Sequence, residues 1–288
     1  AMWITRFRPV GKPKRIGSAH RLPARSAVQR CAMAAFLTIC IPTYNRARYL
    51  AELLETIASQ VRAGGWGPER VAVAVSDNGS PDDTPHVIEH ARSSGLAIES
   101  VRHPQNLGIN PNLCAALEMA RGRFGWLLGD DELLYPDAIS TVLRLLREHD
   151  PGLLLVFDTR YARALPRPAA YRSYREFAAD CARRDPAALT EHTLLSSNIV
   201  RTDCYDAAFA RASLETDFPH MFGIVRGLQR TGETVVVPDA PVIRTREDRP
   251  PPPDGRWVPI DRKWMDYLSW LRTELELPEI DPLAPTRL

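Results

Sequence analysis

Short apolar runs alternate with amphipathic segments from residue 36 onward, and this alternation restricts the fold more than any other feature of the sequence. The amphipathic segments carry apolar residues at helical spacing, as at Leu50, Leu54 and Ile57. Strands that alternate with such helices predict βαβ units, a largely parallel sheet and helices covering both of its faces. The runs that predict strands lie at 36–41, 71–75, 124–128 and 153–157, with a weaker one at 96–101.

The alternation weakens after residue 158. A helix is expected at 218–228, and short strands are expected at 235–237 and 241–246. A run of four prolines, Pro250–Pro253, predicts an extended spacer, and the aromatic residues after it predict a C-terminal helix.

The composition limits the class of protein. The 288 residues are 44% hydrophobic and 25% charged, which is typical of a globular protein and excludes a mostly disordered chain. No apolar stretch approaches the roughly 18 residues that a membrane-spanning helix needs. The five cysteines form no Cys-x-x-Cys pair, which argues against a zinc knuckle or a disulfide framework and favours a reducing compartment.

Basic side chains are concentrated at the N-terminus. Residues 1–30 hold eight of the 37 Lys and Arg residues and no acid, which leaves 29 basic against 35 acidic residues, about −6, in the remainder. Such an arm could bind nucleic acid or anionic lipid, or act as a targeting peptide. We favour a disordered extension or a non-native start, because Met33 opens a sequence typical of the beginning of a domain. The arm therefore does not predict a nucleic-acid partner.

Polar loops follow four of the predicted strands. They are Pro42–Asn45, Asp77–Ser80, Asn106–Gly108 and Gly129–Glu132. The carboxyl ends of parallel strands meet at one edge of a sheet, and ligands of open α/β sheets bind there. We therefore expect the four loops to form one site.

The last of these loops has the most specific pattern. Asp130, Asp131 and Glu132 directly follow an apolar strand, where three carboxylates repel one another unless something neutralises them. Their oxygen atoms suit Mg²⁺ or Mn²⁺, which commonly share such ligands with substrate phosphates. In the alternative interpretation, Asp130 or Asp131 caps a turn and Glu132 is solvated.

Two further loop residues have alternative roles. Asp77 either stabilises a turn or accepts a hydrogen bond from a base or ribose. Tyr44 either packs against the protein or stacks on a base. The sequence contains no Gly-x-Gly-x-x-Gly, P-loop, His-Glu-x-x-His or Gly-x-Ser-x-Gly motif. This weakens the case for dinucleotide, P-loop, zincin and serine-hydrolase chemistry.

Together these loops resemble those of glycosyltransferase family 2, whose members have the GT-A fold and transfer sugars from nucleotide sugars with inversion. The resemblance extends from Leu37 to Arg246 and is most specific in its first part. It implies an α/β fold with a mostly parallel central sheet flanked by helices and a smaller acceptor-side region. The segments that carry it are ICIPTYNRARYLAELLETIASQ, VAVAVSDNGSPDDT and HPQNLGINPNLCAALEMARGRFGWLLGDDELLYPDAI, and more loosely ETDFPHMFGIVRGLQRTGETVVVPDAPVIRTR.

The resemblance implies a role for each matched position. Asp77 would contact the base, and Asp130 would contact the sugar or ribose. Asp131 would be the principal metal ligand with help from Glu132, whereas Gly129 stands where the first aspartate of the family's metal-binding triplet often lies. The other nucleotide-sugar-binding positions are Pro42, Thr43, Tyr44, Asn45, Gly79, Ser80, Asn106 and Gly108.

The family's general base is an acid at the start of a late helix, and Asp217 is the candidate here. Asp217 could instead cap that helix. His220 is a second catalytic candidate, with packing or solvent exposure as the alternative. Arg244 and Arg246 could approach the diphosphate, although arginines at strand ends are usually surface residues. The segment 218–220 is similar in form to that of abequosyltransferase-like members.

The resemblance implies an inverting enzyme that uses a nucleoside diphosphate sugar, a hydroxyl-bearing glycan, lipid-linked or small-molecule acceptor, and Mn²⁺ or Mg²⁺. It divides the chain into an extension (1–33), a nucleotide-sugar half (34–158), an acceptor-side half (159–249) and a spacer with an aromatic helix (250–288). We expect a cytoplasmic protein, either free or peripherally bound at the inner face of the membrane. A sugar-nucleotide nucleotidyltransferase and a non-catalytic nucleotide-sugar-binding or assembly protein stay open as alternatives.

Overall fold

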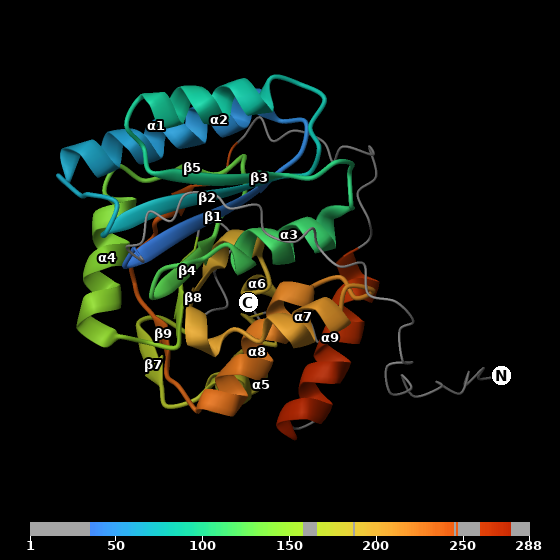
Figure 1. The fold of residues 1–288 in the computed structure, drawn as a ribbon. Helices are drawn as coiled ribbons and strands as arrows, with labels where there is room; N and C mark the ends of the chain where they lie inside the picture. The colour runs from blue at the N-terminus through green and yellow to red at the C-terminus, as the bar shows by residue number, and fades with distance from the viewer. Residues whose placement is uncertain (1–34, 158–165, 187, 245, 247–259, 278–288) are drawn as a thin grey trace. The chain divides into compact units, whose positions relative to one another are not determined.

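Strand β1 lies inside an eight-stranded sheet whose order is β3-β2-β1-β4-β8-β6-β9-β7 (Figure 1). The computed structural model describes residues 35–157, 166–186, 188–244, 246 and 260–277. The strands of this sheet are β1 (Leu37–Thr43), β2 (Val71–Asp77), β3 (Ile98–Arg102), β4 (Phe124–Leu127), β6 (Leu153–Leu155), β7 (Ala169–Tyr171), β8 (Asn198–Arg201) and β9 (Val235–Val237).

The half of the sheet formed by β1 to β4 is parallel, as the sequence predicts. Strand β1 pairs with β2 in a register that places Thr43 beside Asp77, and with β4 in one that places Cys40 beside Leu127. Strands β1, β2 and β4 therefore end at the same edge. The other half is mixed, because β8 is antiparallel to both β4 and β6, and β7 is antiparallel to β9.

Helices pack on both faces of the sheet because side chains alternate along its strands. From β1, Ile39 and Ile41 join a core with α1, α2 and α4, whereas Cys40 joins a second core with α3, α5, α8 and α9 (Figure 1). The helices are α1 (Ala47–Ala63), α2 (Thr84–Ser93), α3 (Ile109–Glu118), α4 (Ala138–His149), α5 (Tyr174–Arg184), α6 (Ala188–Glu191), α7 (Ala207–Ala212), α8 (Pro219–Thr231) and α9 (Ile260–Leu275).

The structure corrects three expectations about the elements. Strand β3 is an edge strand whose last four residues are exposed, so helices do not cover both faces there. The expected strand 241–246 is reduced to β10 (Ile243–Arg244), which pairs with β5 (Leu133–Leu134) in a separate two-stranded sheet. Helix α5 was not predicted, although Ser173 caps its start: the Ser173 hydroxyl accepts from the Glu176 N–H.

Two predicted segments lie outside the described residues: the basic N-terminal extension 1–33 and the proline run Pro250–Pro253. Within the described part of the chain, no helix combines the length and the apolar character that crossing a membrane requires. All described residues belong to one compact unit, Met33–Leu288.

A buried glutamine joins α1 to the start of α4. The Gln60 Nε2 donates to the Tyr135 carbonyl (2.9 Å), and its Oε1 accepts from the Ile139 N–H (3.0 Å). One side chain thus satisfies a buried carbonyl and one of the N–H groups that a helix start leaves without an internal partner.

We expect Gln60→Leu to destabilise the fold by about 1–3 kcal/mol, because it leaves the buried Ile139 N–H without a partner, whereas the Tyr135 carbonyl keeps its hydrogen bond from the Ala138 N–H. Urea unfolding would measure the change in the free energy of unfolding. The matched control is Ser59→Ala, which alters an exposed neighbour on the same helix and should change stability by less than about 0.5 kcal/mol. Equal stability of the two variants would contradict the proposed role of Gln60.

Candidate functional site

The four polar loops meet at the carboxyl edge of the parallel strands, as the sequence predicts. The Thr43 Oγ1, at the end of β1, donates to Asp130 Oδ2 (2.8 Å). Two residues later, Asn45 donates its backbone N–H to Ser80 Oγ (2.9 Å). Hydrogen bonds between the side chain of Asn78 and the Asn106–Gly108 loop complete the connection. We refer to this set of hydrogen-bonded loops as the rim.

The rim holds the predicted nucleotide-side residues at different depths. Thr43, Asp77 and Ser80 are buried, and Tyr44 is half-buried. Pro42 is buried and Gly79 is half-buried, whereas Asn45, Asn106 and Gly108 are exposed.

Asp77 uses its two oxygen atoms differently. The Oδ1 accepts from the Ser80 N–H (2.9 Å), so the turn interpretation is correct for this atom. The Oδ2 lies 3.4 Å from Arg102 Nε and accepts no hydrogen bond within the described part of the chain. The turn leaves a second carboxylate oxygen at the sheet edge, so a contact with a nucleoside is compatible with the turn. The turn also requires Gly79, which has φ of 77° and lies against the backbone of Gln105.

The acidic loop after β4 is buried despite its charge. Asp130 is 4% exposed and Asp131 is 7% exposed. The guanidinium of Arg46 lies against both, with Nη1 at 3.0 Å from Asp130 Oδ1 and 3.4 Å from Asp131 Oδ2. Burial raises the pKa of Asp130 to about 6, the charge of Arg46 opposes that rise, and the charge of Asp131 adds to it.

Ser196 anchors the acidic loop from a distant part of the chain. Its Oγ accepts from the Gly129 N–H (3.0 Å) and donates to Glu132 Oε1 (2.8 Å), and its carbonyl accepts from Trp126 Nε1 (2.9 Å). The sequence analysis missed Ser196 because it lies in the weakly patterned region, in the 3₁₀ turn Leu195–Ser197 just before β8. No local motif marks it.

The charge and chemistry of this loop fit a divalent cation that is shared with a substrate. The guanidinium of Arg46 lies against the carboxylates of Asp130 and Asp131, and carboxylate oxygens are hard ligands. Among the described residues, no three His, Cys, Asp or Glu side chains are grouped to hold a metal by themselves. The residues therefore fit a site that substrate phosphates would complete, with Asp131 and Glu132 as protein ligands.

The segment before Asp217 is bonded to the start of α3. The side chain of Asn110, at the start of α3, donates from Nδ2 to the carbonyls of Leu214 (3.0 Å) and Thr216 (2.6 Å). These bonds hold the segment before α8 against the Asn106–Gly108 loop. Asp217 is half-buried and stands directly before Phe218, the N-cap position of α8.

The other late residues lie differently from the expectations. His220 is 2% exposed, and its Nε2 lies 3.3 Å from the Thr193 carbonyl, which favours the packing alternative over a second base. Arg244 is exposed, as strand-end arginines usually are. Arg246 is buried instead: its Nε donates to the Asp131 carbonyl (3.1 Å) and its Nη2 to Glu52 Oε2 (2.6 Å). Arg246 thus supports the backbone of the acidic loop.

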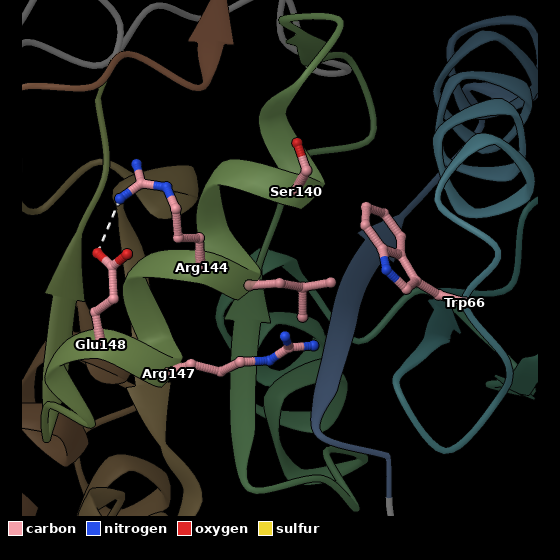
Figure 2. Close-up of a pocket in the computed structure, with 6 residues that line it drawn as sticks. Trp66, Ser140, Arg144, Arg147 and Glu148 are labelled. Atoms are coloured by element: carbon pink, nitrogen blue, oxygen red, sulfur yellow. Dashed lines mark hydrogen bonds and ion pairs between the residues drawn. The ribbon is translucent and has the colours of Figure 1, made fainter.

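A surface pocket of about 320 Å³ lies elsewhere, between Trp66 and α4 (Figure 2). Trp66 precedes the start of β2, so this pocket is near the amino ends of the strands and contains no predicted site residue. Arg144 and Glu148 form an ion pair along its wall. We locate the candidate site at the rim, because the predicted polar residues of four loops converge there.

The comparison with protein families agrees with this geometry. The sequence profile of glycosyl transferase family 2 matches residues 38–213, which is more than half of the chain. The chain belongs to this family. The matched range includes the four loops of the rim and ends before Asp217.

Curated relatives match over part of their length. Abequosyltransferase RfbV of Salmonella typhimurium is 34% identical over 105 residues, which is 36% of this chain and 30% of that protein. The GalNAc(5)-diNAcBac-PP-undecaprenol beta-1,3-glucosyltransferase of Campylobacter jejuni is 28% identical over 113 residues, which is 39% of this chain and 35% of that protein. The chain thus matches about a third of the length of these two relatives.

Solved structures show the fold. Residues 1–349 of Staphylococcus aureus TarS, in complex with UDP-GlcNAc, align with a TM-score of 0.60 at 16% identity, over 85% of this chain and 68% of that one. The mannosyltransferase PcManGT from Pyrobaculum calidifontis, in complex with GDP-Man and Mn²⁺, aligns with a TM-score of 0.54 at 16% identity, over 86% and 66%. The fold is therefore the GT-A fold, as the sequence resemblance implied.

We expect His220 to make the fold sensitive to acid. Burial lowers the pKa of His220 from 6.5 to about 4, although its hydrogen bond to the Thr193 carbonyl opposes this. Between these pH values the unfolded chain binds a proton that the folded chain does not. The stability is therefore complete above pH 6.5 and declines as the pH falls toward 4. At pH 5 the loss due to His220 should be about 2 kcal/mol.

Urea unfolding at pH 7.5 and pH 5 would test this expectation in the wild type, in His220→Gln, and in His86→Gln as an exposed control. The loss of stability on acidification should be about 2 kcal/mol smaller in His220→Gln and unchanged in the control. Equal losses in all three proteins would show that His220 is not the source.

Proposed function

We propose that this chain transfers a sugar from a nucleoside diphosphate sugar to a hydroxyl group of an acceptor, with inversion at the anomeric carbon. The acceptor would be a glycan, a lipid-linked glycan or a small molecule. The observation that carries the proposal is the convergence of the nucleotide-side loops and the acidic loop on one rim, with the segment before Asp217 bonded to the start of α3. Family membership supports the type of reaction. A cytoplasmic location, free or at the inner face of the membrane, stays a prediction.

The donor would lie along the carboxyl ends of β1, β2 and β4. Asp77 Oδ2 would accept a hydrogen bond from the base, and Tyr44 would flank the nucleoside. Asp130, held by Thr43 and Arg46, would contact the sugar or ribose. The donors named for the solved relatives, UDP-GlcNAc and GDP-Man, support a nucleotide sugar and leave the base open. The similarity to abequosyltransferase RfbV supports a dideoxyhexose as one candidate donor sugar.

Asp217 would act as the general base. It would accept the acceptor hydroxyl proton as that oxygen attacks the anomeric carbon and the nucleoside diphosphate departs. The bonds from Asn110 to the carbonyls of Leu214 and Thr216, directly before Asp217, support this role. A divalent cation, Mn²⁺ or Mg²⁺, held by Asp131 and Glu132, would stabilise the charge that develops on the diphosphate.

The two alternatives lack an observation in their favour. A nucleotidyltransferase would release pyrophosphate rather than a nucleoside diphosphate, and the first loop has no glycine-rich phosphate motif. A non-catalytic nucleotide-sugar-binding or assembly protein would have no need of the three acids, yet Asp77, Asp131 and Asp217 are present.

A thermal-shift screen of UDP, GDP, CDP and dTDP, each with Mn²⁺, Mg²⁺ or EDTA, tests the proposal directly. A ligand at 100 times its dissociation constant stabilises a fold by about 2.7 kcal/mol, which raises the melting temperature by a few degrees. One diphosphate should give a shift that is larger with metal. No shift with any of the four would contradict the proposal.

We expect Asp217→Asn to reduce transfer by at least about a hundredfold while nucleotide binding stays near the wild-type value, because a general base acts only on the acceptor side. Release of free nucleoside diphosphate from a nucleotide sugar would measure turnover, and calorimetry would measure nucleotide binding. Glu215→Gln, which changes an exposed acid two residues earlier, is the control and should be active. Loss of binding in Asp217→Asn would remove Asp217 from the role of base.

We expect Asp131→Asn to weaken nucleotide binding in Mn²⁺ by about tenfold or more and to have little effect in EDTA, because it removes the principal ligand charge. Calorimetric titration with the diphosphate found in the screen would measure both. Asp83→Asn, an exposed acid at the start of α2, is the control. If the wild type binds equally well in Mn²⁺ and EDTA, the cation has no place in donor binding.

A further inference from the structure

Arg46 provides the positive charge that touches both aspartates of the acidic loop. It is the last residue before α1, and its side chain is 21% exposed. The sequence analysis gave it no role. We propose that Arg46 is a built-in counter-cation, which holds Asp131 until a divalent cation takes its place and then pairs with the donor's diphosphate. This inference rests on the proposed function, because it concerns the same donor and cation.

The competition follows from the contacts. Arg46 Nη1 lies 3.4 Å from Asp131 Oδ2, so a cation bound to that carboxylate would be close to the guanidinium. Like charges at such a distance repel strongly in a partly buried place. The guanidinium and the divalent cation therefore compete for Asp131. Each reduces the affinity of this carboxylate for the other.

Removing Arg46 would not release the loop. Asp130 keeps its hydrogen bond from Thr43, and Ser196 holds the backbone of Gly129. The Asp131 carbonyl keeps its hydrogen bond from Arg246. Because these contacts come from three other parts of the chain, a change at Arg46 alters the charge beside Asp131 more than it alters the position of the loop.

The guanidinium has N–H groups that can bind phosphate before its contact with Asp131 is broken. Both of its contacts with the aspartates use Nη1, and within the described part of the chain Nη2 and Nε form neither a hydrogen bond nor an ion pair. A guanidinium presents its N–H groups in a planar fork that matches two phosphate oxygens. The first turn of α1, which follows Arg46 directly, contains no acid, so the positive end of that helix adds to the attraction for an anion.

The test uses Arg46→Gln, with Arg62→Gln as the control. Arg62 lies in the last turn of α1, at the opposite end of that helix from Arg46, and pairs with Glu55. Binding of Mn²⁺ alone would be measured by electron paramagnetic resonance, and binding of UDP, GDP, CDP and dTDP in saturating Mn²⁺ by calorimetry. Arg46→Gln should bind Mn²⁺ roughly tenfold more tightly and the diphosphate roughly tenfold more weakly. The control should change neither.

The opposite signs of the two effects separate this role from a structural one. If Arg46→Gln weakens both Mn²⁺ and nucleotide binding, or changes neither, the inference is wrong while the proposed function stands. If the wild type binds no diphosphate with or without metal, the proposed function fails and the inference fails with it.

A second variant keeps the test decisive if Arg46→Gln does not fold. Arg46→Lys keeps the charge and loses the planar fork. It should bind Mn²⁺ as the wild type does and bind the diphosphate more weakly. Wild-type nucleotide binding in Arg46→Lys, or a gain in Mn²⁺ affinity, would overturn the proposal.

Discussion

Two adjacent carboxylates, Asp130 and Asp131, are buried at the end of β4, and the arrangement of the whole rim follows from how their charge is accommodated. An isolated buried carboxylate is costly, so each needs partners with matching hydrogen bonds or charge. The carboxylate partners come from the end of β1 and from Arg46 before α1, whereas Ser196 before β8 and Arg246 after β10 bond to the backbone of the loop. Segments that are distant in sequence are therefore fixed around one loop.

The parallel register makes this convergence possible. Thr43 lies beside Asp77, and β4 runs parallel to β1 on its other side. The register of the strands alone therefore brings three loops to one edge of the sheet. Hydrogen bonds such as that from Asn78 to Asn106 then fix loops that the sheet has already brought together. The sheet supplies the position of the site, and the buried acids supply its electrostatic character.

The parts of the site that depend on local pattern are predictable from the sequence. Strand ends and helix faces follow from apolar periodicity, so periodicity alone is enough to place the loops at Thr43, Asp77 and Asp130 on one edge. Residues that act through long-range contacts cannot be found in this way. Ser196 precedes a four-residue strand, β8, that lies antiparallel between β4 and β6. No sequence motif around Ser196 predicts its hydrogen bond with the acidic loop. Periodicity reports which face a residue occupies, and it does not report its partner.

The segment between α6 and β8 links the acidic loop to α8 and α9. In α9, Trp264 Nε1 donates to Thr193 Oγ1 (3.2 Å), and three residues later Ser196 bonds to Glu132. The Thr193 carbonyl also contacts the first turn of α8, which begins two residues after Asp217. The separation between the acidic loop and the proposed base is therefore set by this irregular segment and by α9. Irregular segments have no periodicity to constrain them, so their sequence can vary while the parallel strands keep the rim loops in place.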